Sequence, residues 1–374
     1  MLNEYITPQL YGAKGDGTTD DTEAFQKAVD SGYDVFVPTA KRETYLITRP
    51  IKITKKQCKR IFSEPLPRRT DSGAIIVNFE GQQEPRASYL FDVHTQLLTI
   101  GGLRFVCRTV DGHRAGIFIN AMDSVCDYDI QIENCSITNF YQVFMFKGRG
   151  LEIINSKITS SQYLADLYWD DEEDSNKNHP AAYDQRAISI KNCRLHNIAS
   201  AFLRVRSGHA YGLHFQGNTV DNGRGYLIRA YDQAYGWNIS GNTIQGINGN
   251  FDVMEFRKGM KDCIITGNTF LSDKGYWAGT ENTVNSWIKC GGNVTSCIIN
   301  NNIFKNADNG FMTFNNLDGS TIVGNAIHNT TASTASAINI TGKSKKSAII
   351  GNAIVSTNPT SLLAKTLPKD NTVL

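Results

Sequence analysis

The stretch Ile239-Ser-Gly-Asn-Thr-Ile244 is one of nine copies of a six-residue phrase that decides the fold. The phrase reads apolar, any residue, Asn or Gly, Asn or a small residue, any residue, apolar. The other copies begin at Ile132, Ile153, Ile190, Phe215, Ile265, Ile299, Ile322 and Ile349. The apolar runs are short, rich in β-branched residues and bounded by Gly and Asn, which favours strands over helices.

The spacing of the copies predicts a solenoid. Their fourth positions follow one another at steps of 21, 37, 25, 24, 26, 34, 23 and 27 residues. A period of roughly 25 residues indicates supersecondary units that can bury their apolar faces only against their neighbours. We therefore predict an all-β fold, a right-handed parallel β-helix whose stacked coils pair their strands in parallel. The fourth-position column consists of Cys135, Ser156, Cys193, Asn218, Asn242, Asn268, Asn302, Asn325 and Asn352.

Asparagine in this column has a physical reason. At a bend, Asn tolerates a left-handed backbone and bonds to nearby backbone groups, and stacked amides can also bond to one another. Cys135 and Cys193 lie in the column, and Cys263 and Cys297 each precede a column Asn by five residues. We expect all four cysteines to be small ladder residues and not reactive thiols.

Residues 19–31 predict an N-terminal capping α-helix. A solenoid exposes its first apolar rung unless a cap covers it. Thr19 or Asp20 can act as the N-cap, and the segment ends at Gly32. The helix would bury an apolar stripe of Ala24, Phe25, Ala28 and Val29. We predict three segments, namely 1–50 (entry motif and capping helix), 51–360 (β-helix) and 361–374 (C-terminal end segment).

The stretch Tyr11-Gly-Ala-Lys-Gly-Asp-Gly-Thr-Thr-Asp-Asp-Thr22, followed by Ala24-Phe25 and Ala28, resembles the entry motif of the pectate-lyase-like β-helix superfamily. That superfamily includes polygalacturonases and the tailspike depolymerases of bacteriophages. The motif specifies the fold and not the reaction, because lyases, hydrolases and non-catalytic members share it. The Gly-His-Gly motif of polygalacturonases and the Trp-Ile-Asp-His segment of pectate lyases are both missing. The resemblance is therefore closest to a phage or prophage tailspike.

A tailspike-like chain implies a homotrimer that binds a bacterial surface polysaccharide and attaches to the virion tail or an adaptor protein through its N-terminus. It also implies synthesis in the host cytoplasm and action outside the cell, at the bacterial surface. The start of the chain lacks signal-peptide character, and no apolar stretch is long enough to span a membrane. A net charge of +2 gives no global attraction to nucleic acid. No His or Cys cluster has metal-site spacing, so we expect neither a metal nor a cofactor.

We predict the functional surface on a second strand of each coil, about ten to fifteen residues after the Asn column. Strand alternation directs Leu203, Val205, Ile228, Ala230, Met254, Phe256, Ile288 and Cys290 inward. The residues between them form two outward columns. One consists of Arg204, Arg229, Glu255, Lys289, Thr313 and Asn339, and the other of Arg206, Tyr231, Arg257, Asn315 and Thr341.

Stacked arginines predict an anionic partner, because like charges on neighbouring strands are otherwise unfavourable. Arginine forks suit the carboxylates of uronate, pyruvate or sialate groups, and Tyr231 offers a ring to a sugar face. The steps of 37 and 34 residues also place long loops at about 159–187 and 271–286 beside these coils. The predicted substrate-binding residues are Arg204, Arg206, Arg229, Arg257, Lys289, Tyr168, Trp169 and Asp170. The alternative is a merely solvated face on which Glu255 offsets the arginines.

Two reactions fit these residues. Glycoside hydrolysis needs two carboxyl groups, about 5–5.5 Å apart for retention and roughly 6.5–9.5 Å apart for inversion. Glu255 is the candidate acid and Asp232 its candidate partner, with Asp252 and Asp170 in reserve. β-Elimination from a uronate needs a cation and a base, for which Tyr231 with Arg229, Arg257, Lys289 or His209 is suitable. We place hydrolysis ahead of elimination, and a receptor-binding spike without catalysis is the third possibility.

Overall fold

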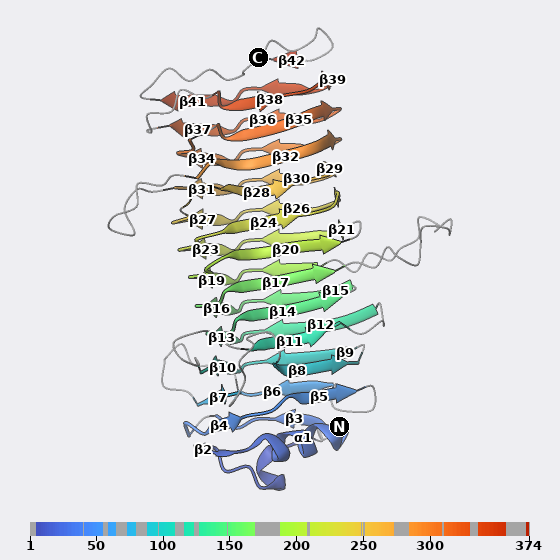
Figure 1. The fold of residues 1–374 in the computed structure, drawn as a ribbon, viewed down its shortest axis with the longest axis vertical. Coiled ribbons are helices and arrows are strands. Elements are labelled where there is room, and N and C mark those ends of the chain that lie inside the picture. The colour runs from blue at the N-terminus through green and yellow to red at the C-terminus, as the bar shows by residue number, and fades with distance from the viewer. Residues whose placement is uncertain are drawn as a thin grey trace. The chain divides into compact units, whose positions relative to one another are not determined.

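The computed structural model describes residues 5–39, 41–54, 59–64, 73–79, 88–95, 97–108, 116–122, 127–147, 149–168, 188–207, 210–247, 249, 251–272, 284–308, 310–329, 336–356 and 372–373. The chain divides into two compact units. The first comprises Met1–Leu167 with Asn192–Arg194, and the second comprises Tyr168–Lys191 with Leu195–Leu374. Each unit consists of coils whose short strands contribute to three parallel sheets (Figure 1).

The first unit begins with the predicted capping helix, α1 (Thr22–Asp30), which follows the 3-10 turn η1 (Pro8–Tyr11). Its predicted apolar stripe of Ala24, Phe25, Ala28 and Val29 is buried. The N-cap is Asp21, so the predicted N-cap at Thr19 or Asp20 is wrong by one or two residues. Asp20 still supports the helix start, because its carboxylate accepts a hydrogen bond from the backbone N–H of Thr22 (3.0 Å). The carboxylate of Asp21 instead closes the entry loop by accepting from the N–H of Lys14 (2.7 Å).

The strands of the first unit stack in register in three sheets. The first sheet contains β1 (Tyr5–Ile6), β3 (Asp34–Phe36), β6 (Arg60–Phe62), β9 (Leu97–Gly101), β12 (Asp127–Glu133) and β15 (Arg149–Ile154). The second contains β2 (Asp16–Asp20), β4 (Thr44–Ile47), β7 (Ala74–Val77), β10 (Arg104–Cys107), β13 (Ser136–Thr138) and β16 (Lys157–Thr159). The third contains β5 (Ile51–Thr54), β8 (Tyr89–His94), β11 (Ile117–Ala121), β14 (Gln142–Lys147) and β17 (Tyr163–Tyr168).

The second unit repeats this arrangement and carries the predicted functional coils. Its first sheet contains β18 (Ile188–Lys191), β22 (Leu213–Gln216), β26 (Asn238–Ser240), β30 (Ile264–Thr266), β33 (Ile298–Asn300), β36 (Thr321–Val323), β40 (Ala348–Ile350) and β42 (Thr372–Val373). Its second contains β19 (Arg194–His196), β23 (Thr219–Asp221), β27 (Thr243–Gln245), β31 (Thr269–Leu271), β34 (Ile303–Lys305), β37 (Ala326–Asn329) and β41 (Ala353–Ser356).

The third sheet of the second unit contains β20 (Ala201–Ser207), β24 (Tyr226–Ala230), β28 (Asp252–Phe256), β32 (Ser286–Thr295), β35 (Met312–Asp318) and β38 (Ile338–Ile340). The short strands β21 (Ala210–Tyr211), β25 (Ala234–Tyr235), β29 (Gly259–Lys261) and β39 (Ser344–Lys345) extend it. Parallel pairing of successive coils in each unit confirms the predicted right-handed parallel β-helix.

The predicted Asn column is a buried hydrogen-bonded ladder in the second unit. The Nδ2 of Asn268 donates to the Oδ1 of Asn302 on the next coil (2.9 Å) and to the carbonyl of Ile239 (2.8 Å). Its Oδ1 accepts from both the backbone N–H (3.0 Å) and the Nδ2 (2.8 Å) of Asn242. The same pattern runs from Asn218 to Asn352. These bonds satisfy polar groups inside the stack, where water does not reach them.

The ladder asparagines do not themselves adopt the predicted left-handed conformation. That conformation belongs to the preceding residue of each phrase, as at Gly241 (φ 65°), Gly267 (φ 62°) and Asn301 (φ 53°). A left-handed residue turns the chain sharply, and Gly and Asn accept it at little steric cost. The third position therefore makes the bend, and the fourth directs its side chain into the stack.

The predicted cysteine ladder is confirmed as a second buried column. The N–H of Cys263 donates to the Sγ of Cys297 (3.5 Å), and the N–H of Cys297 donates to the Oγ of Ser320 (3.0 Å). Burial also raises the pKa of the Cys135 thiol to about 12. All three thiols are buried, and that of Cys135 stays unionised at neutral pH, unlike a reactive cysteine.

The predicted loops lie only partly within the described residues. The first was expected to start near residue 159, but β17 occupies 163–168, so the chain makes another third-sheet strand before leaving the coil. The remainder of that loop, 169–187, and the segment 273–283 fall outside the described residues. No described helix has the length and apolar character needed to cross a membrane. The predicted boundaries at residues 50 and 360 stay a prediction.

Candidate functional site

The predicted outward column exists in the third sheet of the second unit. Strand register aligns Arg204 with Arg229, Arg229 with Glu255, and Glu255 with Lys289. Beyond these coils, Lys289 is aligned with Thr313, and Thr313 with Asn339. All eight residues predicted to point inward are buried. The period-two pattern of these strands therefore predicted the buried positions correctly, although Arg204, predicted to point outward, is also buried.

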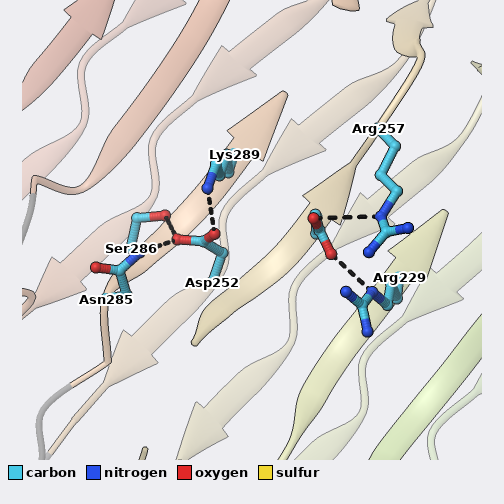
Figure 2. Close-up of polar contacts among 7 residues, drawn as sticks. Arg229, Asp252, Arg257, Asn285, Ser286 and Lys289 are labelled. Atoms are coloured by element: carbon cyan, nitrogen blue, oxygen red, sulfur yellow. Dashed lines mark hydrogen bonds and ion pairs between the residues drawn. The ribbon is translucent and has the colours of Figure 1, made fainter. Parts of the chain in front are cut away.

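Glu255 is held between two arginines. Its Oε2 accepts a hydrogen bond from the Nε of Arg229 (2.7 Å), and its Oε1 lies 3.3 Å from the Nε of Arg257 (Figure 2). The side chain of Glu255 is 17% exposed, so the carboxylate is largely shielded from water. Each carboxylate oxygen of Glu255 thus has its own arginine partner.

Aromatic rings surround the same arginines. The Arg229 guanidinium lies 4.3 Å from the Tyr226 ring centroid and 5.4 Å from that of Tyr231. The Arg257 guanidinium lies 4.6 Å and the Arg206 guanidinium 5.6 Å from the Tyr231 centroid. Tyr231 thus lies among three cations, an arrangement held together by cation–π attraction. We call Glu255, Arg229, Arg257, Tyr226 and Tyr231 the Glu255 cluster.

Lys289 belongs to a different ion pair. Its Nζ donates to the Oδ2 of Asp252 (2.9 Å), whose Oδ1 accepts from Ser286 Oγ (2.7 Å) and Asn285 Nδ2 (2.6 Å). Figure 2 shows this group beside the arginine pair. The hydrogen bond to Asp252 raises the pKa of Lys289 above its ordinary value. Lys289 is therefore a fixed cation, and its register partner Glu255 bonds to the arginines instead.

Asp232 lies at the bend that follows β24. Its Oδ2 pairs with the Nζ of Lys258 on the next coil (3.1 Å), and its Oδ1 accepts from the N–H of Gln233 (2.8 Å). Lys258 is 66% exposed, so this is a surface ion pair of small energetic value. The structure thus leaves Asp232 with a weakly held partner, whereas Glu255 has a short contact to Arg229 and a longer one to the more exposed Arg257.

Four other predicted substrate-binding residues are either buried or have side chains outside the described residues. Arg204 is only 7% exposed, so little of its side chain is available to a large ligand. Tyr168 ends β17, and its side chain, like Trp169 and Asp170, lies outside the described residues. The described residues hold no group of three or more His, Cys, Asp or Glu side chains that could bind a metal ion.

Sequence reasoning missed Tyr226, and it named Asp252 only as a reserve catalytic carboxylate and not as the partner of Lys289. Tyr226 packs on Arg229, and Asp252 neutralises Lys289. Each begins its strand, before the alternating segment from which the columns were read. The alternating pattern could not reveal these contacts, because a period of two assigns Tyr226 to the inward face of Ile228 and Asp252 to the inward face of Met254.

The fold and this surface define a class, a right-handed parallel β-helix with a cationic and aromatic face on its third sheet. A family model described as "Right handed beta helix region" matches residues 103–270. A segment of 48 residues is 48% identical to the pre-neck appendage protein of Bacillus phage phi29. That segment covers 13% of this chain and 5% of the phage protein's length.

Solved structures share the fold at low sequence identity. Tailspike protein 3 of bacteriophage CBA120 has a TM-score of 0.60 and 15% identity, and the match covers 100% of this chain and 61% of that one. The catalytic domain of a GH87 alpha-1,3-glucanase has a TM-score of 0.59 and 11% identity, with coverage of 100% and 68%. Phage tailspikes and glycan-degrading enzymes thus share the architecture described above.

Proposed function

We propose that this chain is a tailspike-like depolymerase that binds an acidic bacterial surface polysaccharide on its third sheet and cleaves it by endo-acting glycoside hydrolysis. The Glu255 cluster carries this proposal. It combines a carboxyl group, two guanidinium groups and a tyrosine ring on one outward surface. Guanidinium groups bind sugar carboxylates, and rings pack against the apolar face of a sugar.

The ion pairs revise the role that the sequence suggested for Glu255. A general acid must donate a proton, whereas both carboxylate oxygens of Glu255 act as acceptors toward arginine Nε–H groups. We therefore assign Glu255 as the base or nucleophile of hydrolysis. Asp232 is the proposed acid, because its exposed partner Lys258 can be displaced when substrate binds.

A second reaction is favoured by the surroundings of Tyr231. β-Elimination from a uronate requires cations that neutralise the sugar carboxylate and a base that removes the C5 proton. Arg206, Arg229 and Arg257 all lie within 6 Å of the Tyr231 ring centroid. Tyr231 would be the base, and Glu255 would then only position arginines.

The assembly is part of the same proposal. Phage appendage proteins match a short part of the chain, and a phage tailspike shares its fold. We propose that the chain forms a homotrimer on a virion tail, joined to the tail or an adaptor through its N-terminal part. Polysaccharide would then be bound outside the cell, at the bacterial surface.

The test is to incubate the protein with a panel of purified bacterial capsules and O-antigens. Hydrolysis predicts new reducing ends, falling polymer size and no ultraviolet absorbance from unsaturated sugar. Elimination predicts the same fall in size with that absorbance. Glu255→Gln should abolish hydrolysis and retain binding, while Glu152→Gln, on the first sheet of the first unit, should behave as wild type. A polymer that is bound but never shortened would leave only a receptor-binding role.

A further inference from the structure

Resting on the proposed function, we infer that the two arginines of the cluster have separate tasks. Arg257 binds the carboxylate of an acidic sugar and so determines specificity for a charged glycan. Arg229 stays with Glu255 and acts as its positioning residue. The two contacts to Glu255 differ in length, burial and packing, and those differences assign the tasks.

Arg229 is placed to remain where it is. It lies directly across from Glu255 in the strand register, and its contact with the carboxylate is short, at 2.7 Å. Its side chain is 23% exposed and packs over the Tyr226 ring at 4.3 Å. Moving Arg229 toward a ligand would break a short charge-assisted bond and leave a shielded carboxylate without its best partner, which is costly.

Arg257 is placed to exchange partners. It lies two residues from Glu255, just past the end of β28, and its contact with the carboxylate is longer, at 3.3 Å. Its side chain is 41% exposed. A long and solvated ion pair contributes little free energy, so a ligand can compete for it.

The donor atoms support the same division. Both arginines contact Glu255 through Nε. The terminal nitrogens of the exposed Arg257 therefore remain to grip a second carboxylate with two parallel hydrogen bonds. The Tyr231 ring, 4.6 Å from this guanidinium, supports it from one side. A bound uronate would thus take Arg257 from its weak contact with Glu255, while Arg229 keeps the Glu255 carboxylate in place.

The neighbouring cations are less suited to this task. Lys289 is bonded to Asp252 at 2.9 Å and offers a point charge without a fork. Arg204 is only 7% exposed. Of these cations, Arg257 is the one that is exposed and has a guanidinium group able to form two parallel hydrogen bonds. It also lies beside Glu255, the carboxylate that would act on the sugar.

The test compares one polysaccharide in two forms, the acidic capsule that wild type cleaves in the panel and the same polymer after chemical reduction of its carboxyl groups. Arg257→Ala should lower the preference for the acidic form about 10- to 100-fold, mainly through KM. Arg257→Lys keeps the charge without the fork and should recover only part of it. Arg229→Ala should keep the preference and lose at least about tenfold in kcat.

Circular dichroism and melting of each variant monitor folding, and Lys305→Ala on the second sheet is the control for loss of a distant cation. The inference is overturned if Arg257→Ala keeps the acidic preference or if Arg229→Ala removes it, and either result leaves the proposed cleavage standing. If wild type binds no acidic polysaccharide, the proposed function fails and the inference fails with it. Equal cleavage of both forms by wild type overturns the inference alone.

Discussion

Replacing Asn268 with Ala should strongly destabilise the second unit, because this side chain joins three coils. It donates to Asn302 and Ile239 and accepts twice from Asn242. After truncation, Asn302 Oδ1 still accepts from the Asn268 N–H (3.0 Å), and Asn242 Nδ2 still donates to the Phe215 carbonyl (2.8 Å). The buried N–H of Asn242 loses its acceptor.

The magnitude follows from these four bonds. An orphaned buried N–H costs about 1–3 kcal/mol, and each of the other lost bonds contributes about 0.5–1.5 kcal/mol. We expect a total of about 2.5–7.5 kcal/mol for Asn268→Ala. Asn268→Ser should lose less, because a serine in such a ladder accepts the N–H of the preceding coil, as Ser156 does for Cys135 (3.1 Å).

The assay is guanidinium unfolding of wild type, Asn268→Ser, Asn268→Ala and the exposed control Gln245→Ala, followed by circular dichroism. The guanidinium concentration at the unfolding midpoint should be lower for Asn268→Ser than for wild type and lower still for Asn268→Ala. The midpoint of Gln245→Ala should be near that of wild type. If unfolding is irreversible, unfolding half-lives should show the same ranking. A loss below about 1 kcal/mol for Asn268→Ala, or a serine variant no better than alanine, would refute the ladder account.

Three further predictions follow from particular contacts. Gly225→Ala should prevent correct folding, because a Cβ there would lie 1.5 Å from the Ser200 carbonyl oxygen, and a wild-type-like melting curve would contradict this. Stability should fall as the pH rises from about 9 to about 12, because burial raises the pKa of Cys135 and Cys290 to about 12 and only the unfolded thiols ionise in that range. The free energy of unfolding should fall by about 1.4 kcal/mol per pH unit for each thiol. Replacing both cysteines with serine should remove this pH dependence, which unfolding measurements at several pH values would show. Binding of acidic polysaccharide should weaken as salt rises, more steeply for wild type than for Arg257→Ala, and equal slopes in titration calorimetry would argue against an ionic contact there.

Much of the fold was predictable because every coil of a β-helix uses the same bend, the same ladder position and the same buried apolar positions. The six-residue phrase gave the bend, the ladder residue and the first apolar positions of two strands, and the register of Arg229 with Glu255 followed from strand alternation. The exact start of α1 was not predictable, because Asp20 and Asp21 are both good caps and only the entry loop decides between them.

The sequence predicted which residues lie on the candidate surface, but it did not predict all the contacts among their side chains. Sequence spacing placed Glu255 among arginines, but it could not show that Lys289 turns to Asp252, since that depends on side-chain rotamers and on Ser286 and Asn285. Tyr226 was missed for a similar reason, because its packing on Arg229 depends on where its strand begins. The sequence therefore shows which residues share the outward surface. It does not show which of the neighbouring charged side chains each one pairs with.

The most direct test of the proposed function is the size and reducing-end content of an acidic capsular polysaccharide after incubation with wild type and with Glu255→Gln. We predict that wild type shortens the polymer and releases reducing ends without unsaturated product. We predict that Glu255→Gln binds the polymer and leaves its size unchanged. Full activity in Glu255→Gln would contradict the assignment of this carboxylate as the catalytic group.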